Sequence, residues 1–257
     1  MMGVSKLVGI TKPKLGQMET GRQYQSATDI ALLLNAYGVD RETIDRLVAL
    51  TERAEEAAWA TGSAHAVPDW FRIYLGLERI ATRVFTFDPL LVPGLLQHER
   101  YARAVTSASL FVRTPDVDRV VELRMARTER LHCADKPLEL HAVTTEAALR
   151  LRMADPAVHK AQLQHLLDLS ERPNVTIQVL PPEAGYHDAH RGQFGLLEFE
   201  EVRALAYTET IDSALYVQDP DQVKNYALVA KALEEQALDP DETKKLIAEV
   251  IATFNDS

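Results

Sequence analysis

The chain has 257 residues, of which 46% are hydrophobic and 26% are charged. This length accommodates one large domain, or a small domain followed by a larger one. Its 38 acidic and 28 basic side chains give a net charge of −10, which argues against a protein that binds nucleic acid over its whole surface. A small basic module on an acidic body is still compatible with this charge.

The sequence predicts a cytoplasmic protein without a metal ion or another cofactor. It contains no run of 18 consecutive apolar residues, so neither a transmembrane helix nor a membrane partner is expected. The N-terminus lacks the long apolar core of a signal peptide. Cys133 is the only cysteine, which excludes an intrachain disulfide and a cysteine metal cluster.

Positive charge is concentrated at the start of the chain. The charged side chains of the first 22 residues are Lys6, Lys12, Lys14 and Arg22 against Glu19. Apolar spacing predicts a short helix over residues 4–10 and a second helix that starts at Thr11 and stops at Gly21. Leu15 and Met18 lie three residues apart in this second helix and are expected to face a core. Two short helices joined by a tight turn are typical of a helix-turn-helix.

Two longer helices follow. One amphipathic helix is predicted over residues 27–37, and a second, capped by Asp40, runs toward Trp59. The next few residues have the composition of a linker. We therefore place residues 1–60 in a helical unit and residues 64–257 in a second domain.

The second domain mixes helices and strands without regular alternation. Strands are predicted over residues 84–87, 138–142, 174–179, 194–199, 203–210 and 215–217. Helices are predicted to start near residues 68, 95, 117, 146 and 156, and two more helices end the chain. The predicted fold class is α+β, with a short all-helical unit followed by a mixed helix and antiparallel-sheet domain.

Residues 87–105 carry the most distinctive local sequence. Pro89 and Pro93 favour extended conformations for the residues before them, and Gly94 is expected to allow a sharp turn into a helix. The run Pro93-Gly94-Leu95-Leu96-Gln97, followed by Tyr101-Ala102-Arg103-Ala104, resembles a signature of the WhiJ-type regulators. Three later blocks fit the same pattern in order, at residues 146–150, 166–181 and 207–210. These regulators join an Xre-like helix-turn-helix to a C-terminal domain of poorly defined role.

The resemblance extends to the N-terminus, where residues 11–22 look like the recognition helix of an Xre-like motif. It implies that this helix enters the major groove of double-stranded DNA. The implied DNA-facing residues are Thr11, Lys12, Lys14 and Gln17, and Arg22 is the implied phosphate contact. The resemblance also implies a homodimer and a small partner protein.

The family pattern has a full helix and most of another ahead of Ser5. The sequence therefore indicates either a misassigned start codon or a shortened DNA-binding unit. Without the missing helices to pack against, Leu7, Leu15 and Met18 are expected to be partly exposed to water. Each exposed side chain should cost about 1 kcal/mol or more of folding free energy. If the unit no longer binds DNA, the large domain must be the functional part.

The polar candidates of the second domain are Glu146, Arg150, His187, His190, Arg191, Tyr207 and Glu209. All of them except His190 and Arg191 are predicted ligand contacts. Two carboxylates in one cleft could act as acid and base, but pairing of Glu146 and Glu209 with arginines is the favoured interpretation. The loop His187-Asp188-Ala189-His190-Arg191 has the ligand types for a metal, yet it matches no defined zinc motif, and a solvated polar loop is favoured.

Aromatic residues cluster in the sequence around the distinctive stretch. They are Trp70, Tyr74, Phe85, Phe87 and Tyr101. Core packing is the plain interpretation of this cluster. A hydrophobic ligand pocket is the sharper hypothesis, and it adds Phe87 and Tyr101 to the ligand candidates.

Three functional hypotheses follow. The first is a transcriptional regulator whose large domain senses a small molecule or a partner protein and thereby alters DNA binding. The second is a regulator-derived protein that has lost DNA binding and acts as an enzyme or a small-molecule binding protein in a biosynthetic pathway. The shortened N-terminus favours this alternative, whereas the lack of a visible catalytic motif argues against an enzyme. The third is a decayed regulator that only titrates its protein partner.

Overall fold

The computed structural model describes residues 5, 8–19, 25–59, 67–153, 155–200 and 202–254. The chain divides into two compact units, Met1–Ile80 and Ala81–Ser257. The boundary that the sequence predicts near residues 60–64 falls outside the described residues.

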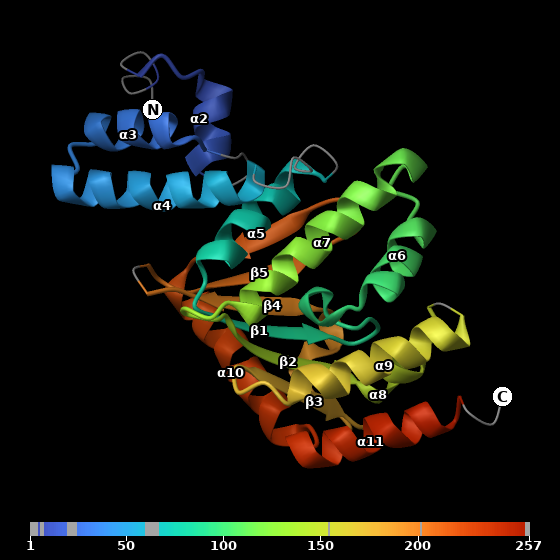
Figure 1. The fold of residues 1–257 in the computed structure, drawn as a ribbon. Helices are drawn as coiled ribbons and strands as arrows, with labels where there is room; N and C mark the ends of the chain where they lie inside the picture. The colour runs from blue at the N-terminus through green and yellow to red at the C-terminus, as the bar shows by residue number, and fades with distance from the viewer. Residues whose placement is uncertain are drawn as a thin grey trace. The chain divides into compact units, whose positions relative to one another are not determined.

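The described part of the first unit is built of helices (Figure 1). They are α2 (Lys12–Glu19), α3 (Ala27–Ala36), α4 (Arg41–Trp59) and α5 (Asp69–Ile80). Ser26 and Asp40 cap the starts of α3 and α4, because each side chain accepts a hydrogen bond from a backbone N–H of the first turn. The cap predicted at Asp40 is therefore confirmed. The helix predicted over residues 4–10 and the stop predicted at Gly21 fall largely outside the described residues.

The first unit has a small core of its own. Its members are Ile10, Leu15, Met18 and Leu33, with Val8 packed against them. Leu15 and Met18 are only 1% and 2% exposed. The expectation that they lose their cover is therefore wrong, because α3 and the residues just before α2 supply it. Leu7, the third residue of that expectation, lies outside the described residues.

The second unit is organised on a six-stranded sheet in the order β3-β2-β1-β4-β5-β6. The strands are β1 (Arg83–Asp88), β2 (Glu139–Thr145), β3 (Val175–Leu180), β4 (Phe194–Glu198), β5 (Leu205–Glu209) and β6 (Ala214–Val217). The α+β class is confirmed. The antiparallel pairs β1–β4, β4–β5 and β5–β6 are joined by two parallel pairs, β1–β2 and β2–β3. Helical segments lie between β1, β2 and β3 in the chain, and such crossovers are what parallel pairing requires.

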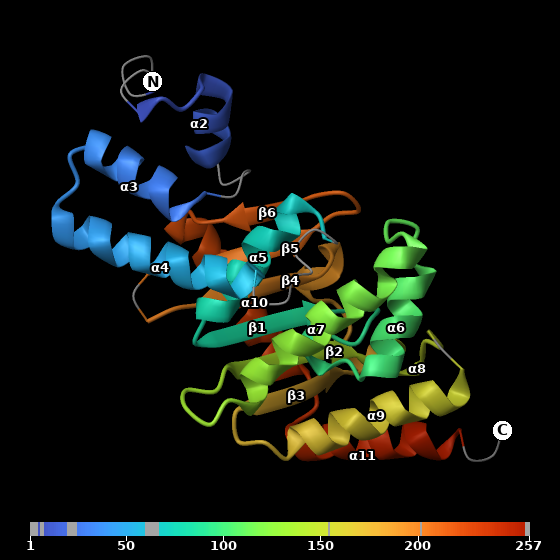
Figure 2. The same ribbon diagram turned by 45° about the horizontal axis from the view of Figure 1, so that its top comes forward.

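Helices cover both faces of this sheet. They are α6 (Glu99–Ala108), α7 (Val117–His132), α8 (Glu146–Arg150), α9 (Pro156–Ser170), α10 (Pro220–Gln236) and α11 (Pro240–Ala252). Helices α7 and α9 lie against one face and α10 against the other (Figures 1 and 2). An Asp-Pro pair starts α9, α10 and α11, with the aspartate as the cap and the proline in the first turn. None of the helices in the described ranges has the length and apolarity that crossing a bilayer requires.

The sequence predicts that the distinctive stretch, residues 87–105, turns at Gly94 directly into a helix, and the structure differs from this prediction in detail. Gly94 opens a short 3₁₀ helix, Gly94–Leu96, and α6 begins only at Glu99. The φ angle of Gly94 is not positive, so this turn does not require a glycine. Gln162 of α9 holds the stretch in place, since its Nε2 donates to the backbone oxygen of Leu96 at 2.8 Å and its Oε1 accepts from the backbone N–H of His98 at 2.7 Å.

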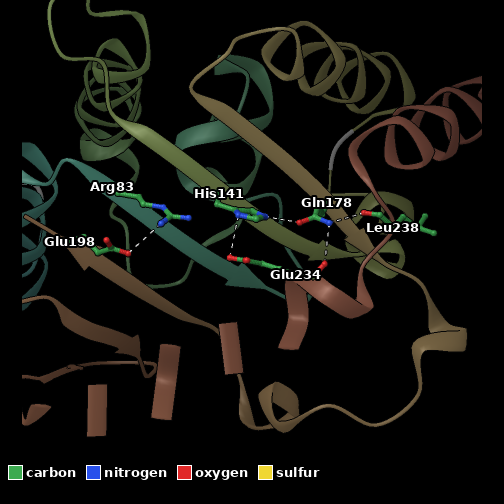
Figure 3. A network of polar contacts seen from close by, with 6 residues as sticks. All are labelled: Arg83, His141, Gln178, Glu198, Glu234 and Leu238. Atoms are coloured by element: carbon green, nitrogen blue, oxygen red, sulfur yellow. Dashed lines mark hydrogen bonds and ion pairs between the residues drawn. The ribbon is translucent and has the colours of Figure 1, made fainter. Parts of the chain in front are cut away.

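A polar network ties α10 to the sheet (Figure 3). The Nε2 atom of His141 in β2 lies 2.6 Å from the Oε1 atom of Gln178 in β3, and its Nδ1 atom lies 3.2 Å from the carboxylate of Glu234 in α10. The amide nitrogen of Gln178 donates to the backbone oxygens of Glu234 and Leu238. These contacts hold the C-terminal end of α10 against the sheet.

Candidate functional site

Helix α2 presents the candidate DNA-facing side chains. Thr11, Lys12 and Gln17 are exposed, whereas Leu15 and Met18 face the core of the first unit. Leu15 and Met18 anchor one side of the helix, Lys12 and Gln17 are exposed on its flanks, and Thr11 is exposed just before the helix begins. The helix therefore offers a polar surface at its N-terminal end.

The two remaining DNA candidates differ in their surroundings. The Nζ atom of Lys14 lies 3.0 Å from the carboxylate of Asp29 in the first turn of α3, and its side chain is 38% exposed. This ion pair holds α2 against α3 and offsets part of the positive charge of Lys14. Arg22 lies outside the described residues.

The two candidate carboxylates of the second unit have separate partners. The carboxylate of Glu146 lies 2.6 Å from Nε of Arg150, one turn further along α8. The carboxylate of Glu209 accepts a hydrogen bond from the hydroxyl of Tyr207 at 2.6 Å. Glu146 follows β2 and Glu209 ends β5, and these strands are three positions apart in the sheet, about 14 Å at the usual strand spacing. The structure therefore does not bring these carboxylates together as an acid–base pair.

The aromatic candidates of the second unit lie on different elements. Phe87 is fully buried in the core between the sheet and α10, with Phe85 beside it. Tyr101 is also fully buried, but it lies on α6. Burial raises the pKa of its hydroxyl. Trp70 and Tyr74 belong to α5 in the first unit.

His187 lies next to Phe87, with ring centroids 5.6 Å apart, and 4.4 Å from the ring of His190. Burial lowers the pKa of His187, and the neighbouring His190 lowers it further. Within the described ranges, no group of three or more histidine, cysteine, aspartate or glutamate residues could hold a metal ion. The histidines of this loop therefore interact with aromatic rings and with each other.

A cleft of about 330 Å³ opens in the second unit beside this loop. It is lined by Asp188, Ala189, Arg191, Gly192, Gln193, Phe194, Thr208, Asn225, Tyr226 and Val229. Apolar side chains from β4 and α10 line part of it, and polar side chains from the loop, β5 and α10 line the rest. An apolar cavity with a few polar groups is typical of a small-molecule site.

The seven predicted ligand contacts do not line this cleft, although His187 is adjacent to it. Arg191, a polar candidate of the same loop, does line it. The cleft combines a loop, the end of β5 and two turns of α10. Periodicity marks Tyr226 as an inward-facing residue of α10, but it carries no signal for Gln193, Thr208 or Asn225.

Two family models match the chain. The first describes a helix-turn-helix domain and covers residues 2–47, which gives the chain the organisation of a DNA-binding helix-turn-helix regulator. The second describes a domain of unknown function (DUF5753) and covers residues 71–249. The chain therefore belongs to the DUF5753 family. No curated protein and no solved structure shows significant similarity to it.

Proposed function

We propose that this protein is a cytoplasmic, WhiJ-type transcriptional regulator whose helix-turn-helix domain binds duplex DNA and whose DUF5753 domain senses a small molecule. One observation carries the DNA-binding part. Within the helix-turn-helix match, α2 exposes Thr11, Lys12 and Gln17 while it buries Leu15 and Met18. A helix that is anchored by apolar residues and keeps polar side chains exposed near its N-terminal end can present those side chains to the major groove.

The proposed contacts divide by role. Thr11, Lys12, Lys14 and Gln17 would face the groove from the N-terminal end of α2, and Arg22 would bind a phosphate. Lys14 would contribute less charge than Lys12, because Asp29 already pairs with it. A homodimer would place two such helices about 34 Å apart on successive major grooves.

Binding of the full chain to the region upstream of its own gene, measured at two salt concentrations, tests this proposal. We expect site-selective binding that weakens as salt rises. Lys12→Gln should weaken it and reduce the slope of log affinity against log salt by about one. Lys231→Gln is the matched control, because Lys231 is an exposed lysine of α10 in the second unit. Equal effects of the two variants, or binding without site selectivity, would contradict the assignment.

The cleft beside β4 favours a second candidate function. A chain with this cleft but without DNA affinity would act as a small-molecule binding protein, or as an enzyme, in a biosynthetic pathway. Absence of duplex binding at low salt, together with saturable binding of a small molecule, would favour this alternative. A small partner protein that binds the chain in place of the small molecule is the other form of the sensing hypothesis, and co-purification with the product of a neighbouring gene tests it.

A further inference from the structure

We infer that the 330 Å³ cleft of the second unit binds a small organic anion with a flat apolar body, such as an aromatic carboxylate, and that Arg191 is the residue that selects the negative charge. The inference deepens the sensing role proposed above and rests on it for any effect on DNA. Binding itself does not depend on that role.

The position of the cleft is the first argument. Strands β1, β2 and β3 are parallel, and their C-terminal ends form one edge of the sheet. Phe194 pairs with Phe87 near the end of β1, and Tyr207, beside Thr208, pairs with Gly195. The cleft residues Phe194 and Thr208 therefore lie at this edge, where the parallel half of the sheet meets the antiparallel half. Ligands of sheets with parallel strands bind outside the C-terminal ends of those strands, at points where the strand arrangement changes.

The apolar side of the cleft is mostly aromatic. Phe194 is buried, and its ring packs against Phe85, Phe87 and Tyr226 with centroids 5.4 to 6.2 Å apart. Val229 lies one turn beyond Tyr226 in α10, on the same side of the cleft. A flat apolar group gains most from such a surface, because aromatic rings prefer offset-stacked or edge contacts with other rings.

The polar side of the cleft has one available cation. Arg191 makes no hydrogen bond or ion pair with any other described residue, and the same holds for the side-chain amides of Gln193 and Asn225. The one acid of the cleft, Asp188, accepts a hydrogen bond from the hydroxyl of Tyr186 at 3.0 Å. A planar guanidinium with free donors binds a carboxylate through two parallel hydrogen bonds. The two amides can complete the coordination of the same group.

Two probes of the same shape, one charged and one neutral, distinguish the contribution of the negative charge to affinity from that of apolar contact. The full-length protein is titrated with 2-naphthoate and with the uncharged 2-naphthamide, by calorimetry and by saturation-transfer NMR. We expect saturable binding of the carboxylate, at least about tenfold tighter than that of the amide, since the charged pair is the difference between them. Equal affinities, or no saturable binding of naphthoate at millimolar concentration, would overturn the inference.

Arg191→Gln tests the residue directly. It should reduce naphthoate affinity about tenfold or more and leave the weak binding of naphthamide unchanged. Arg203→Gln is the matched control, because Arg203 is an exposed arginine in the loop between β4 and β5 and does not line the cleft. If Arg203→Gln weakened naphthoate binding as much as Arg191→Gln, the assignment of Arg191 would be wrong.

Val229→Phe tests the apolar side. The larger ring should fill the cleft and weaken both probes, with folding checked by the thermal unfolding midpoint. Unchanged binding of both probes in the folded variant would overturn the location of the site. DNA binding is measured separately, without probe, so failure of the ligand site and failure of the regulator proposal give different results. Naphthoate binding that leaves DNA affinity unchanged would support the site and contradict sensing of this ligand class.

Discussion

The Nε2 atom of His141 lies 2.6 Å from the Oε1 atom of Gln178, and this contact joins the side chains of two neighbouring parallel strands (Figure 3). The amide nitrogen of Gln178 points the other way and donates to the backbone oxygens of Glu234 and Leu238, at 3.2 and 3.0 Å. With its two N–H donors engaged, the Oε1 atom of Gln178 is the acceptor and His141 the donor. Gln178 therefore fixes the end of α10, the helix that forms one side of the cleft.

Replacement of Gln178 should destabilise the protein. Gln178→Leu leaves the oxygens of Glu234 and Leu238 without this donor, and we expect the free energy of unfolding to fall by about 1–3 kcal/mol. Urea denaturation of the full chain measures the change. Gln164→Leu is the control, because Gln164 is exposed on α9 and Asp168 is the one partner of its side chain among the described residues. Its effect should stay within about 0.5 kcal/mol, and equal losses in the two variants would refute the proposed role of Gln178.

Replacement of Gln162 should destabilise the protein to a similar extent. Gln162 belongs to α9, on the opposite face of the sheet from α10 (Figures 1 and 2). Its side chain is fully buried and bonds to the backbone of Leu96, which ends the 3₁₀ helix, and of His98, which caps α6. Gln162→Leu should cost about 1–3 kcal/mol of unfolding free energy. Amide hydrogen exchange adds a local readout, since the N–H of His98 should lose protection more than the interior of α9 does. Unchanged protection at His98 would show that another group takes over as acceptor.

Local sequence predicts the elements of this fold well but not their pairing. All six strands were predicted, because alternation of apolar and polar residues is a property of a few neighbouring positions. The parallel pairs β1–β2 and β2–β3 depend instead on contacts between residues more than 30 positions apart. His141 alternates with Leu140 and Ala142, which predicts a solvated face, but α10 covers that face and His141 is half-buried.

The same distinction applies to the sites. The DNA-facing residues follow from a single short helix, so a resemblance over residues 11–22 is enough to nominate them. The cleft is different, because Arg191, Thr208 and Tyr226 come from a loop, a strand end and a helix that meet only in the folded chain. No spacing in the sequence relates these three positions, which explains why the predicted ligand residues lie elsewhere.

Gly192 should be required by the fold, whereas Gly94 should not. Gly192 lies at the edge of the cleft with φ 135° and ψ −179°, a conformation that is almost restricted to glycine. Gly192→Ala should lower the free energy of unfolding by about 1–3 kcal/mol. Gly94 has an ordinary φ, and the atoms nearest to an added methyl group are the side-chain ends of Arg124 and Arg127, at 3.5–3.7 Å.

Gly94→Ala is therefore the matched control for Gly192→Ala. It should leave the free energy of unfolding unchanged or raise it by about 0.4–1 kcal/mol, because alanine restricts the unfolded chain. Chemical denaturation of both variants under the same conditions makes the comparison. A larger loss for Gly94→Ala than for Gly192→Ala would contradict the backbone argument and indicate that residues 93–97 need glycine for another reason.

Stability should fall in mildly acidic solution because of the histidine next to Phe87. Burial lowers the pKa of His187 below its ordinary value of 6.5, and His190 lowers it further, while Asp188 acts in the opposite direction. The unfolded chain then binds more protons than the folded chain between the lowered pKa and 6.5. The stability that neutral His187 contributes is fully present above pH 6.5 and is lost as the pH falls through the pKa of His187 in the folded chain.

His187→Asn should flatten this dependence. We expect the free energy of unfolding of the original chain to decrease more between pH 7.5 and 5.5 than that of the variant, and the comparison uses the slope because the variant also loses the ring contact with Phe87. His132→Asn is the control, since His132 is exposed at the end of α7 and should retain most of the slope. His165, whose pKa burial also lowers, should contribute a slope of the same sign in both the original chain and His187→Asn. Equal slopes in the original chain and in His187→Asn would mean that the loop between Gly185 and Gly192 opens enough for water to reach the His187 ring.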